Sequence, residues 1–325
     1  MISPALPPAL RAVLDTKLHG LSRSDTAVRA AVISKTYRDG GGSGTIRTEA
    51  DALAYALARM PATYAAVAAC LNALIDVRPD FAPQSLLDIG AGPGTATFAA
   101  AEAFPSLQDL ALLDRNRPLR ALATELAAEN PRLSRLSYSS GEARSALAQA
   151  DGADLVVASY VIGEFAEPER DDLVALAWSK ARDALLIVEP GTPAGYARII
   201  AARAQLITNG AHVLAPCPHD APCPLTAPDW CHFAQRLARS RAHKEIKGTE
   251  LPFEDEKFSY VIVARAPAPN RPARVLAAPA VSKVEVAAKL CTAGGVTLAK
   301  VPRRDRGGYA AARRWRWGDG VVEES

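Results

Sequence analysis

The chain has 325 residues, of which 49% are hydrophobic and 22% are charged. This composition excludes global disorder, and the length allows one α/β domain with additions. The net charge of +3 is uneven, because residues 232–325 hold 18 Lys and Arg against 10 Asp and Glu. Neither a long apolar run nor a signal peptide is apparent, so we expect a cytoplasmic monomer without membrane contact.

The N-terminal region, residues 1–82, is predicted to be helical. Apolar residues recur at helical spacing up to a glycine-rich loop, DGGGSGTIRT, which breaks the pattern. Thr48 is a candidate N-cap for the next helix. Pro61 is expected to stop or kink that helix before it resumes.

From Ser85 onward, short apolar runs alternate with helical segments, which is typical of a parallel sheet buried on both faces. We therefore predict an α/β fold with a doubly wound, mainly parallel, Rossmann-like sheet over residues 83–267. This unit includes a cysteine-rich loop at 214–232 and a basic strand at 233–247. Residues 268–325 are predicted to form a small, basic, β-rich appendage with a hairpin around Gly294–Gly295.

The segment LLDIGAGPGTAT places Asp88, Gly90, Gly92 and Gly94 between a strand and a helix. Glycines at this position allow a tight turn and close approach of backbone N–H groups to a ligand. The spacing differs from the dinucleotide pattern and resembles motif I of class I methyltransferases, in which the loop wraps the methionine part of S-adenosylmethionine. The sequence thus predicts a class I methyltransferase fold with this cofactor.

The next strand ends at Asp114, a carboxylate suited to accepting hydrogen bonds from both ribose hydroxyls. The alternative is that Asp114 caps the following helix. We place Asp154 and the SYVIGEF turn at the carboxyl edge of the sheet, where Ser159 and Tyr160 line the pocket or pack the loop.

No catalytic residue is predicted. The segment SYVI lacks the Pro-Pro-aromatic motif of amino methyltransferases, and residues 154–165 and 186–193 contain no cysteine nucleophile. Cofactor binding without methyl transfer therefore stays open.

Cys70 lies in an apolar helical segment and is expected to be a core residue. Three of the other cysteines cluster in a proline-rich loop, and the fourth comes from the C-terminal appendage. In a reducing compartment such a set indicates a metal centre more than disulfides, and thiolates select zinc, copper(I) or iron–sulfur clusters. The predicted ligands are Cys217, Cys223, Cys231 and Cys291.

The C-x5-C-x7-C spacing is wider than the short pairs of zinc knuckles and favours an iron–sulfur cluster, with zinc as the alternative. His219 and His232 lie in the same stretch and could replace a cysteine. An inert loop is the remaining interpretation.

Seven segments occur together in one order: RMPATYAAV, SLLDIGAGPGTATFAA, VIGEF, LLIVEPGTP, APCPHDAPCPL, DWCHFAQRLAR and EDEKFSYVIVAR. Over residues 55–317 the chain resembles the Rsm22 family. The resemblance implies a class I methyltransferase fold, association with the small ribosomal subunit during assembly, and a [4Fe–4S] cluster on the four cysteines above. It leaves methyl transfer to small-subunit rRNA unsettled.

Residues 303–317 of the C-terminal appendage contain six arginines with aromatic residues between them, a pattern that suits phosphate pairing and base stacking. The alternative is an amphipathic helix whose tryptophans pack on the core. Three functions follow: an rRNA methyltransferase, a cofactor- and rRNA-binding assembly factor without methyl transfer, and a zinc-stabilised small-molecule methyltransferase. The arginines of this pattern are Arg303, Arg304, Arg306, Arg313, Arg314 and Arg316, and the aromatic residues between them are Tyr309, Trp315 and Trp317.

Overall fold

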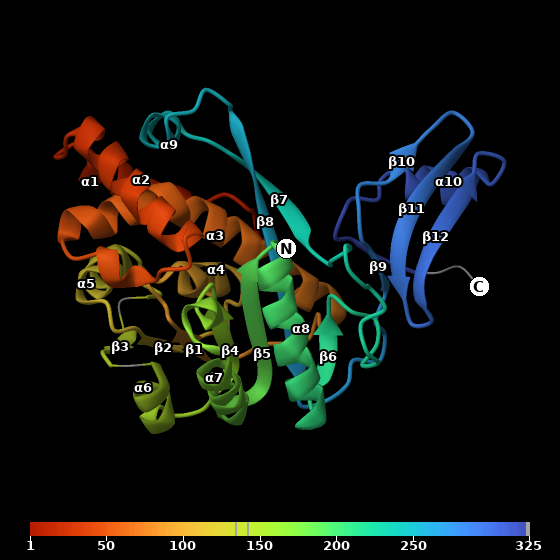
Figure 1. Cartoon of the computed structure of the whole chain (residues 1–325), viewed down its shortest axis with the longest axis horizontal. Helices are drawn as coiled ribbons and strands as arrows, with labels where there is room; N and C mark the ends of the chain where they lie inside the picture. Colours follow the sequence, from red (N-terminus) through yellow and green to blue (C-terminus); the bar gives the residue numbers. More distant parts are fainter. Residues whose placement is uncertain (134, 142, 323–325) are drawn as a thin grey trace.

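A computed structural model describes residues 1–133, 135–141 and 143–322 (Figure 1). The strand expected near 133–138 includes one residue outside this set, and residues 323–325 of the appendage also lie outside it. The helices are α1 Pro8–Leu18, α2 Arg23–Arg38, η1 Ser43–Thr45, α3 Glu49–Val77, α4 Thr95–Ala103, α5 Arg117–Ala128, α6 Ala143–Gln149, η2 Ile162–Glu164, α7 Glu167–Lys180, α8 Pro193–Thr208, α9 Arg241–Lys247 and α10 Arg306–Ala312.

The strands form two sheets. The larger sheet has the order β3-β2-β1-β4-β5-β8-β6, with β7 paired to β8, and the smaller contains β9 to β13. The strands are β1 Ser85–Ile89, β2 Asp109–Leu113, β3 Ser137–Ser139, β4 Ala153–Ser159, β5 Ala181–Pro190, β6 His212–Ala215, β7 Phe233–Ala238, β8 Phe253–Ala264, β9 Ala273–Val275, β10 Ala280–Val281, β11 Glu285–Thr292, β12 Gly295–Pro302 and β13 Gly320–Val321.

The larger sheet confirms the predicted fold class. Strands β1 to β5 pair in parallel, whereas β8 lies antiparallel between β5 and β6. This arrangement is the doubly wound sheet of class I methyltransferases. Strand order reverses between β1 and β4, and such a switch point leaves a crevice at the carboxyl ends of the strands.

Both faces of the sheet are buried, as the apolar strand sequences predict. Alternate side chains of β1 enter different cores: Leu86 packs with α3, α4 and α5, while Leu87 packs with α7 and α8. Because side chains alternate across a strand, a strand covered on both faces must be apolar at almost every position.

Helix α3 runs without a break through Pro61, so the predicted stop is wrong. Thr48 caps its start as expected, in a reciprocal capping box with Asp51. Packing against α2, α4, α5 and β8 holds the helix together despite the backbone hydrogen bond that Pro61 lacks. By length and composition α3 could also cross a membrane, but most of it is buried inside this fold.

The basic strand predicted at 233–247 is only half correct. Strand β7 ends at Ala238, and Ser240 then caps the short helix α9 by accepting a hydrogen bond from the His243 N–H. Strand β8 continues past the sheet to pair with β7, and this hairpin carries α9 toward the N-terminal helices (Figure 1).

The smaller sheet lies at one side of the molecule, beyond β6 (Figure 1). Its main hairpin, β11 with β12, turns at the predicted glycines, and Thr292 pairs with Gly295 across it. Contacts back to the larger unit include a hydrogen bond from Arg274 to the Pro216 carbonyl and an ion pair between Lys289 and Asp229.

Candidate functional site

A pocket of about 350 Å³ opens at the carboxyl ends of β1, β2 and β4, where the strand order reverses. Of the predicted cofactor residues, Gly90, Gly92, Asp114 and Ser159 line it, and Tyr160 does as well. Asp88 and Gly94 do not. Ligands of doubly wound sheets bind at this position.

The glycine loop has the backbone that only glycine adopts easily. Gly90, Gly92 and Gly94 have φ values of +67°, +54° and +80°. A Cβ on Gly90 would also lie 2.4 Å from Cγ2 of Val161 on the opposite wall. The first glycine is thus required both by conformation and by the narrow gap between the β1 and β4 loops.

Asp88 lies beneath the loop and is fully buried. One carboxylate oxygen accepts hydrogen bonds from Thr97 N and Oγ1, at 3.1 and 2.7 Å. The other oxygen is buried without a partner. Burial raises the pKa of Asp88 to about 7, against the opposing effect of the Thr97 hydrogen bonds. Asp88 therefore anchors α4 to the loop instead of facing the pocket.

Asp114 faces the pocket and also shapes it. Its oxygens accept from Gly92 N at 2.8 Å and from Asn116 N at 2.7 Å. The capping alternative is wrong, because Asn116 is the N-cap of α5. Burial raises the pKa of Asp114, although these backbone hydrogen bonds work in the other direction. Each carboxylate oxygen retains a lone pair for a ligand hydroxyl.

The placement of Asp154 at the ligand edge is wrong. It is the second residue of β4, at the amino end, where it accepts hydrogen bonds from Gln84 N and Ser85 N. Because β4 is seven residues long, its other end carries Ser159 into the pocket.

The N-terminal wall of the pocket was not predicted from the sequence. The glycine-rich loop after α2 reaches the site, where Asn116 Nδ2 donates to the carbonyls of Ser43 and Ile46 at 3.0 and 2.9 Å. Tyr37 and Tyr55 also line the pocket, with ring centroids 5.8 Å apart. Local sequence gave no signal for this approach, because it joins segments about 70 residues apart.

Glu164, in the VIGEF segment, is the other missed residue. It lines the pocket, and a Cβ on Gly42 would lie 2.6 Å from its carboxylate, so the glycine-rich loop closes directly over it. Burial, followed by the negative charge of Asp114, raises the pKa of Glu164 to about 7. The pocket thus holds a carboxyl group that exchanges a proton near neutral pH.

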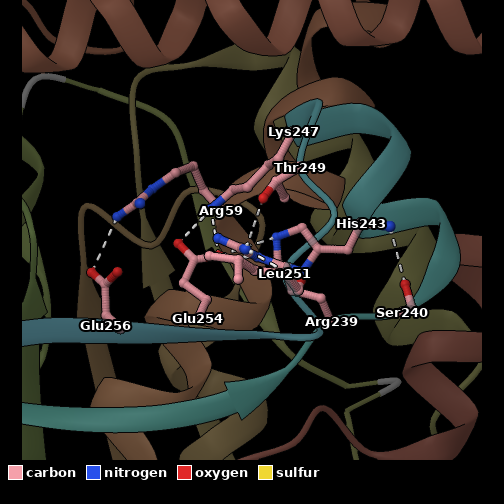
Figure 2. Close-up of polar contacts among 9 residues, drawn as sticks. All are labelled: Arg59, Arg239, Ser240, His243, Lys247, Thr249, Leu251, Glu254 and Glu256. Carbon is pink, nitrogen blue, oxygen red and sulfur yellow. Dashed lines mark hydrogen bonds and ion pairs between the residues drawn. The ribbon is translucent and has the colours of Figure 1, made fainter.

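Tyr160 adopts a left-handed conformation, with φ of +57°, which is unusual for a residue with a side chain. Its hydroxyl donates to Glu256 Oε1 at 3.0 Å, and Arg59 pairs with the same oxygen at 3.3 Å. Figure 2 shows Arg59 reaching Glu256 beside a second cluster around Glu254. Polar contacts with α3 and β8 therefore brace the pocket wall.

The four cysteines predicted as metal ligands interact electrostatically. Burial raises the pKa of Cys231, and the neighbouring thiolates of Cys217, Cys223 and Cys291 raise it further. Tyr196 Oη donates to Cys223 Sγ at 3.2 Å. Cys70 is a fully buried core residue, as predicted, and all five thiols are free.

Within the described residues, no three Cys, His, Asp or Glu side chains are arranged to hold a single metal ion. His219 Nε2 lies 3.8 Å from Cys291 Sγ, whereas His232 stacks on Trp230. The carbonyls of this loop accept hydrogen bonds from two buried arginines, Arg203 and Arg274.

The six arginines predicted to contact phosphates, from Arg303 to Arg316, are all exposed. The tryptophans are not free for base stacking: Trp315 packs on the core of the smaller sheet, and Trp317 packs on the main core and edge-on to His232. A cavity of about 1080 Å³ lies beside them, between the smaller sheet, α3 and β7. The predicted helix is short and ends at Ala312.

A family model described as mitochondrial small ribosomal subunit Rsm22 matches residues 49–322. The chain is 30% identical over 235 residues to the human "Ribosome assembly protein METTL17, mitochondrial", covering 67% of this chain and 50% of that protein. It is 27% identical over 253 residues to "Rsm22-cox11 tandem protein 2, mitochondrial" of Schizosaccharomyces pombe, covering 67% of this chain and 32% of that one. The chain thus spans half or less of these relatives.

Among solved structures, the chain is similar to a putative RNA methyltransferase from Pyrococcus horikoshii, with 12% identity, a TM-score of 0.40, and coverage of 61% of this chain and 80% of that one. It is also similar to the magnesium protoporphyrin IX methyltransferase of Synechocystis with bound SAM, with 16% identity, a TM-score of 0.40, and coverage of 76% and 98%. TM-scores this low carry no argument, so the fold assignment rests on the observed strand order.

The prediction of a cytoplasmic protein is wrong, because the family and both relatives are described as mitochondrial. Composition and surface charge reflect folding and solubility, whereas a compartment is specified by signals that receptors read. A reducing cytoplasm therefore no longer favours metal ligation by the cysteines over disulfides, and the support left for a metal centre is that the thiols are free and interact electrostatically.

Proposed function

The chain belongs to the Rsm22 family, and from this premise we propose that it is a monomeric, S-adenosylmethionine-binding assembly factor of the small ribosomal subunit. The human relative's description as a ribosome assembly protein supports the ribosomal part. The observation that carries the cofactor part is the pocket at the switch point, with Asp114 facing it and three glycines forming its loop.

The ligand residues are Gly90, Gly92, Asp114 and Ser159 in the pocket wall, with Asp88 and Gly94 supporting the loop from beneath. The charges suit a cationic sulfonium better than a pyrophosphate. Asp114 already accepts the hydrogen bond from the Gly92 N–H that a phosphate would need, and the negative charge of its carboxylate would repel a phosphate. Asp114 is left to bind the ribose hydroxyls.

Calorimetric titration with S-adenosylmethionine tests this proposal. Asp114→Asn should weaken binding at least about tenfold, because a charge-assisted hydrogen bond contributes about 1.5–3 kcal/mol. Asp109→Asn is the matched control, since Asp109 is exposed at the opposite end of the same strand. Wild-type protein that does not bind the cofactor, or equal affinity in Asp114→Asn, would contradict the assignment.

The partner is small-subunit rRNA together with ribosomal proteins. The exposed arginines of the appendage supply phosphate contacts, and the adjacent cavity offers aromatic and basic walls. Replacing Arg313 and Arg314 by Gln should weaken rRNA binding. The slope of the logarithm of the binding constant against the logarithm of the salt concentration should also fall, by the amount expected for about two lost phosphate contacts. Arg11 and Arg38, exposed on the N-terminal helices, provide a control pair with the same charge change.

We place a [4Fe–4S] cluster on Cys217, Cys223, Cys231 and Cys291. Four cysteines that interact electrostatically are the ligand set that a [4Fe–4S] cluster takes. When bound, the cluster supplies a redox-active or structural link between the cysteine loop and β11. Protein purified without air should contain about four irons, and Cys223→Ser should lose them, whereas zinc alone would contradict the cluster.

Methyl transfer to rRNA is a second candidate activity, favoured by Glu164. Bound S-adenosylmethionine supplies an electrophilic methyl group, and Glu164, whose pKa is about 7, can accept the proton that the RNA acceptor releases. Labelled methyl transfer to immature small subunits should be lost in Glu164→Gln while cofactor binding persists. Full subunit assembly by an Asp88→Ala chain that does not bind the cofactor would instead favour assembly without catalysis.

A further inference from the structure

Two arginines are buried against the cysteine loop. Arg203, on α8, and Arg274, on β9, are each only 3% exposed. Arg203 Nη2 donates to the carbonyls of His219 and Ala221 at 2.7 and 2.9 Å. Arg274 Nε donates to the Pro216 carbonyl at 3.2 Å, and its Nη1 donates to the Gly318 carbonyl at 2.8 Å. Both guanidinium groups therefore hold the loop that contains Cys217 and Cys223.

These contacts leave the charges of the two arginines without a counter-ion. Carbonyls satisfy N–H groups but carry no net charge, and among the described residues neither arginine forms an ion pair with a carboxylate. Arg203 Nε is buried with no hydrogen-bond partner. An unpaired buried cation costs several kcal/mol, so a fold that retains two needs negative charge nearby.

The nearby acids do not provide it. Asp220 pairs with Arg271 at 2.7 Å and faces His212 at 3.6 Å, and Asp229 pairs with Lys289. The guanidiniums lie instead against the cysteine loop on both sides of Cys217 in the chain: Arg274 donates to the Pro216 carbonyl, and Arg203 donates to the His219 carbonyl.

We propose that Arg203 and Arg274 are buried counter-charges for an anionic metal–thiolate centre on the four cysteines. This inference rests on the metal centre proposed above. Four thiolates carry four negative charges, and a [4Fe–4S] core with two positive charges leaves a net charge of −2. Two guanidinium groups balance that charge, and they come from two separate elements, α8 and β9.

The two arginine charges should therefore raise the midpoint potential of the cluster. Reduction adds one electron to the cluster, and adjacent positive charge stabilises the more negative state. Removal of either guanidinium charge should make the midpoint potential more negative. The double replacement should shift it by about the sum of the single shifts if the two charges act independently.

The experiment is a redox titration, followed by electron paramagnetic resonance, of anaerobically purified full-length protein. Arg203→Gln and Arg274→Gln should each lower the midpoint potential, whereas Arg203→Lys and Arg274→Lys should keep it near that of wild type because they keep the charge. Arg265→Gln controls for loss of an arginine charge away from the cysteine loop, since the exposed Arg265 also donates only to carbonyls, those of Trp178 and Ala181. The lysine variants also separate loss of charge from loss of folding.

The outcomes distinguish this inference from the cluster proposal. Iron-loaded Gln variants with the wild-type potential would overturn the role of the arginines and leave the cluster intact. If wild type takes up cadmium or zinc but no iron, the cluster proposal fails, while weaker cadmium binding by the Gln variants would still support the counter-charge role. Cadmium–thiolate absorbance measures this binding. A wild-type protein that binds none of these metals would overturn both.

Discussion

Asp88 shows how one residue can support a site without touching its ligand. Its position before the glycine loop is that of a cofactor ligand, yet its carboxylate bonds Thr97 in α4 and stays buried. Burial removes water from the carboxylate and disfavours its charged form. Its effect on the cofactor is therefore indirect, through the rigidity of the loop.

Asp88 should make stability depend on pH. Its pKa is about 7 in the folded protein against an ordinary 3.8, so the folded state keeps a proton that the unfolded chain releases between these values. The stability that Asp88 contributes should fall by roughly 4 kcal/mol as pH rises from about 4 to 7, at about 1.4 kcal/mol per pH unit. Asp88→Asn should remove this slope.

Thermal unfolding across this pH range measures the effect as the difference between wild type and Asp88→Asn. The difference is needed because burial, followed by Lys247, lowers the pKa of His243 to about 4, which changes stability in the opposite direction between pH 4 and 6.5. Asp109→Asn should show the wild-type slope. A parallel profile for Asp88→Asn would refute the assignment.

At Gly90, steric conflict should exceed backbone strain. Gly90→Ala places Cβ 2.4 Å from Val161 Cγ2 in a left-handed conformation, whereas Gly210→Ala has similar strain, with φ of +79°, but no atom within 4 Å. Gly210→Ala should cost about 1 kcal/mol and Gly90→Ala at least about 2 kcal/mol more by denaturant unfolding. Adding Val161→Ala should restore part of the loss; no restoration would argue against the clash.

At the scale of elements, Pro61 lies in the interior of α3, where a proline is unfavourable for the helix. Pro61 has no N–H for the carbonyl of Leu57, and it lies inside an otherwise continuous helix. Pro61→Ala should stabilise the protein by about 1–3 kcal/mol and raise its Tm. Pro118→Ala, in the first turn of α5 where the N–H is not used, should give no such gain. A Tm that falls in Pro61→Ala would show that ring packing outweighs the hydrogen bond.

The β7–β8 hairpin is held by a charge cluster on Glu254 (Figure 2). Its carboxylate lies 2.6 Å from Lys247, 3.2 Å from Arg239 and 3.6 Å from His243, and all four side chains are largely buried. Glu254→Gln would leave cationic groups without a counter-ion and should cost about 3 kcal/mol. Glu250→Gln, exposed on the same hairpin, should be neutral. Equal stability of the two variants would mean that water screens the cluster.

For the whole molecule, the proposed metal centre should couple the two sheets. Three of its proposed ligands follow β6, and Cys291 lies on β11 of the smaller sheet. Removal of iron by a chelator should therefore speed hydrogen exchange in β9 and β11 while leaving β1 and β4 protected. Cys291→Ser should show the fast exchange even before chelation. Unchanged exchange after complete iron loss would separate the centre from the docking of the smaller sheet.

The molecule also divides, in our proposal, into residues 1–82, 83–267 and 268–325, with the cofactor pocket and three of the four clustered cysteines on the middle unit and Cys291 on the last. The N-terminal unit still shapes the pocket, because Ser43 and Ile46 accept hydrogen bonds from Asn116. A chain without its N-terminal helices would therefore lose one wall of the cofactor pocket.

The sequence by itself determined the sheet, the glycine loop and the β11–β12 hairpin. Each depends on local patterns: apolar strands buried on both faces, φ values open to glycine, and a Gly-Gly turn. Only the tertiary structure decided that Asp88 is buried, that Asp154 lies at the opposite edge, and that Glu164 meets the glycine-rich loop. Those outcomes depend on contacts between segments far apart in the chain, where packing and desolvation act, and local sequence does not encode them.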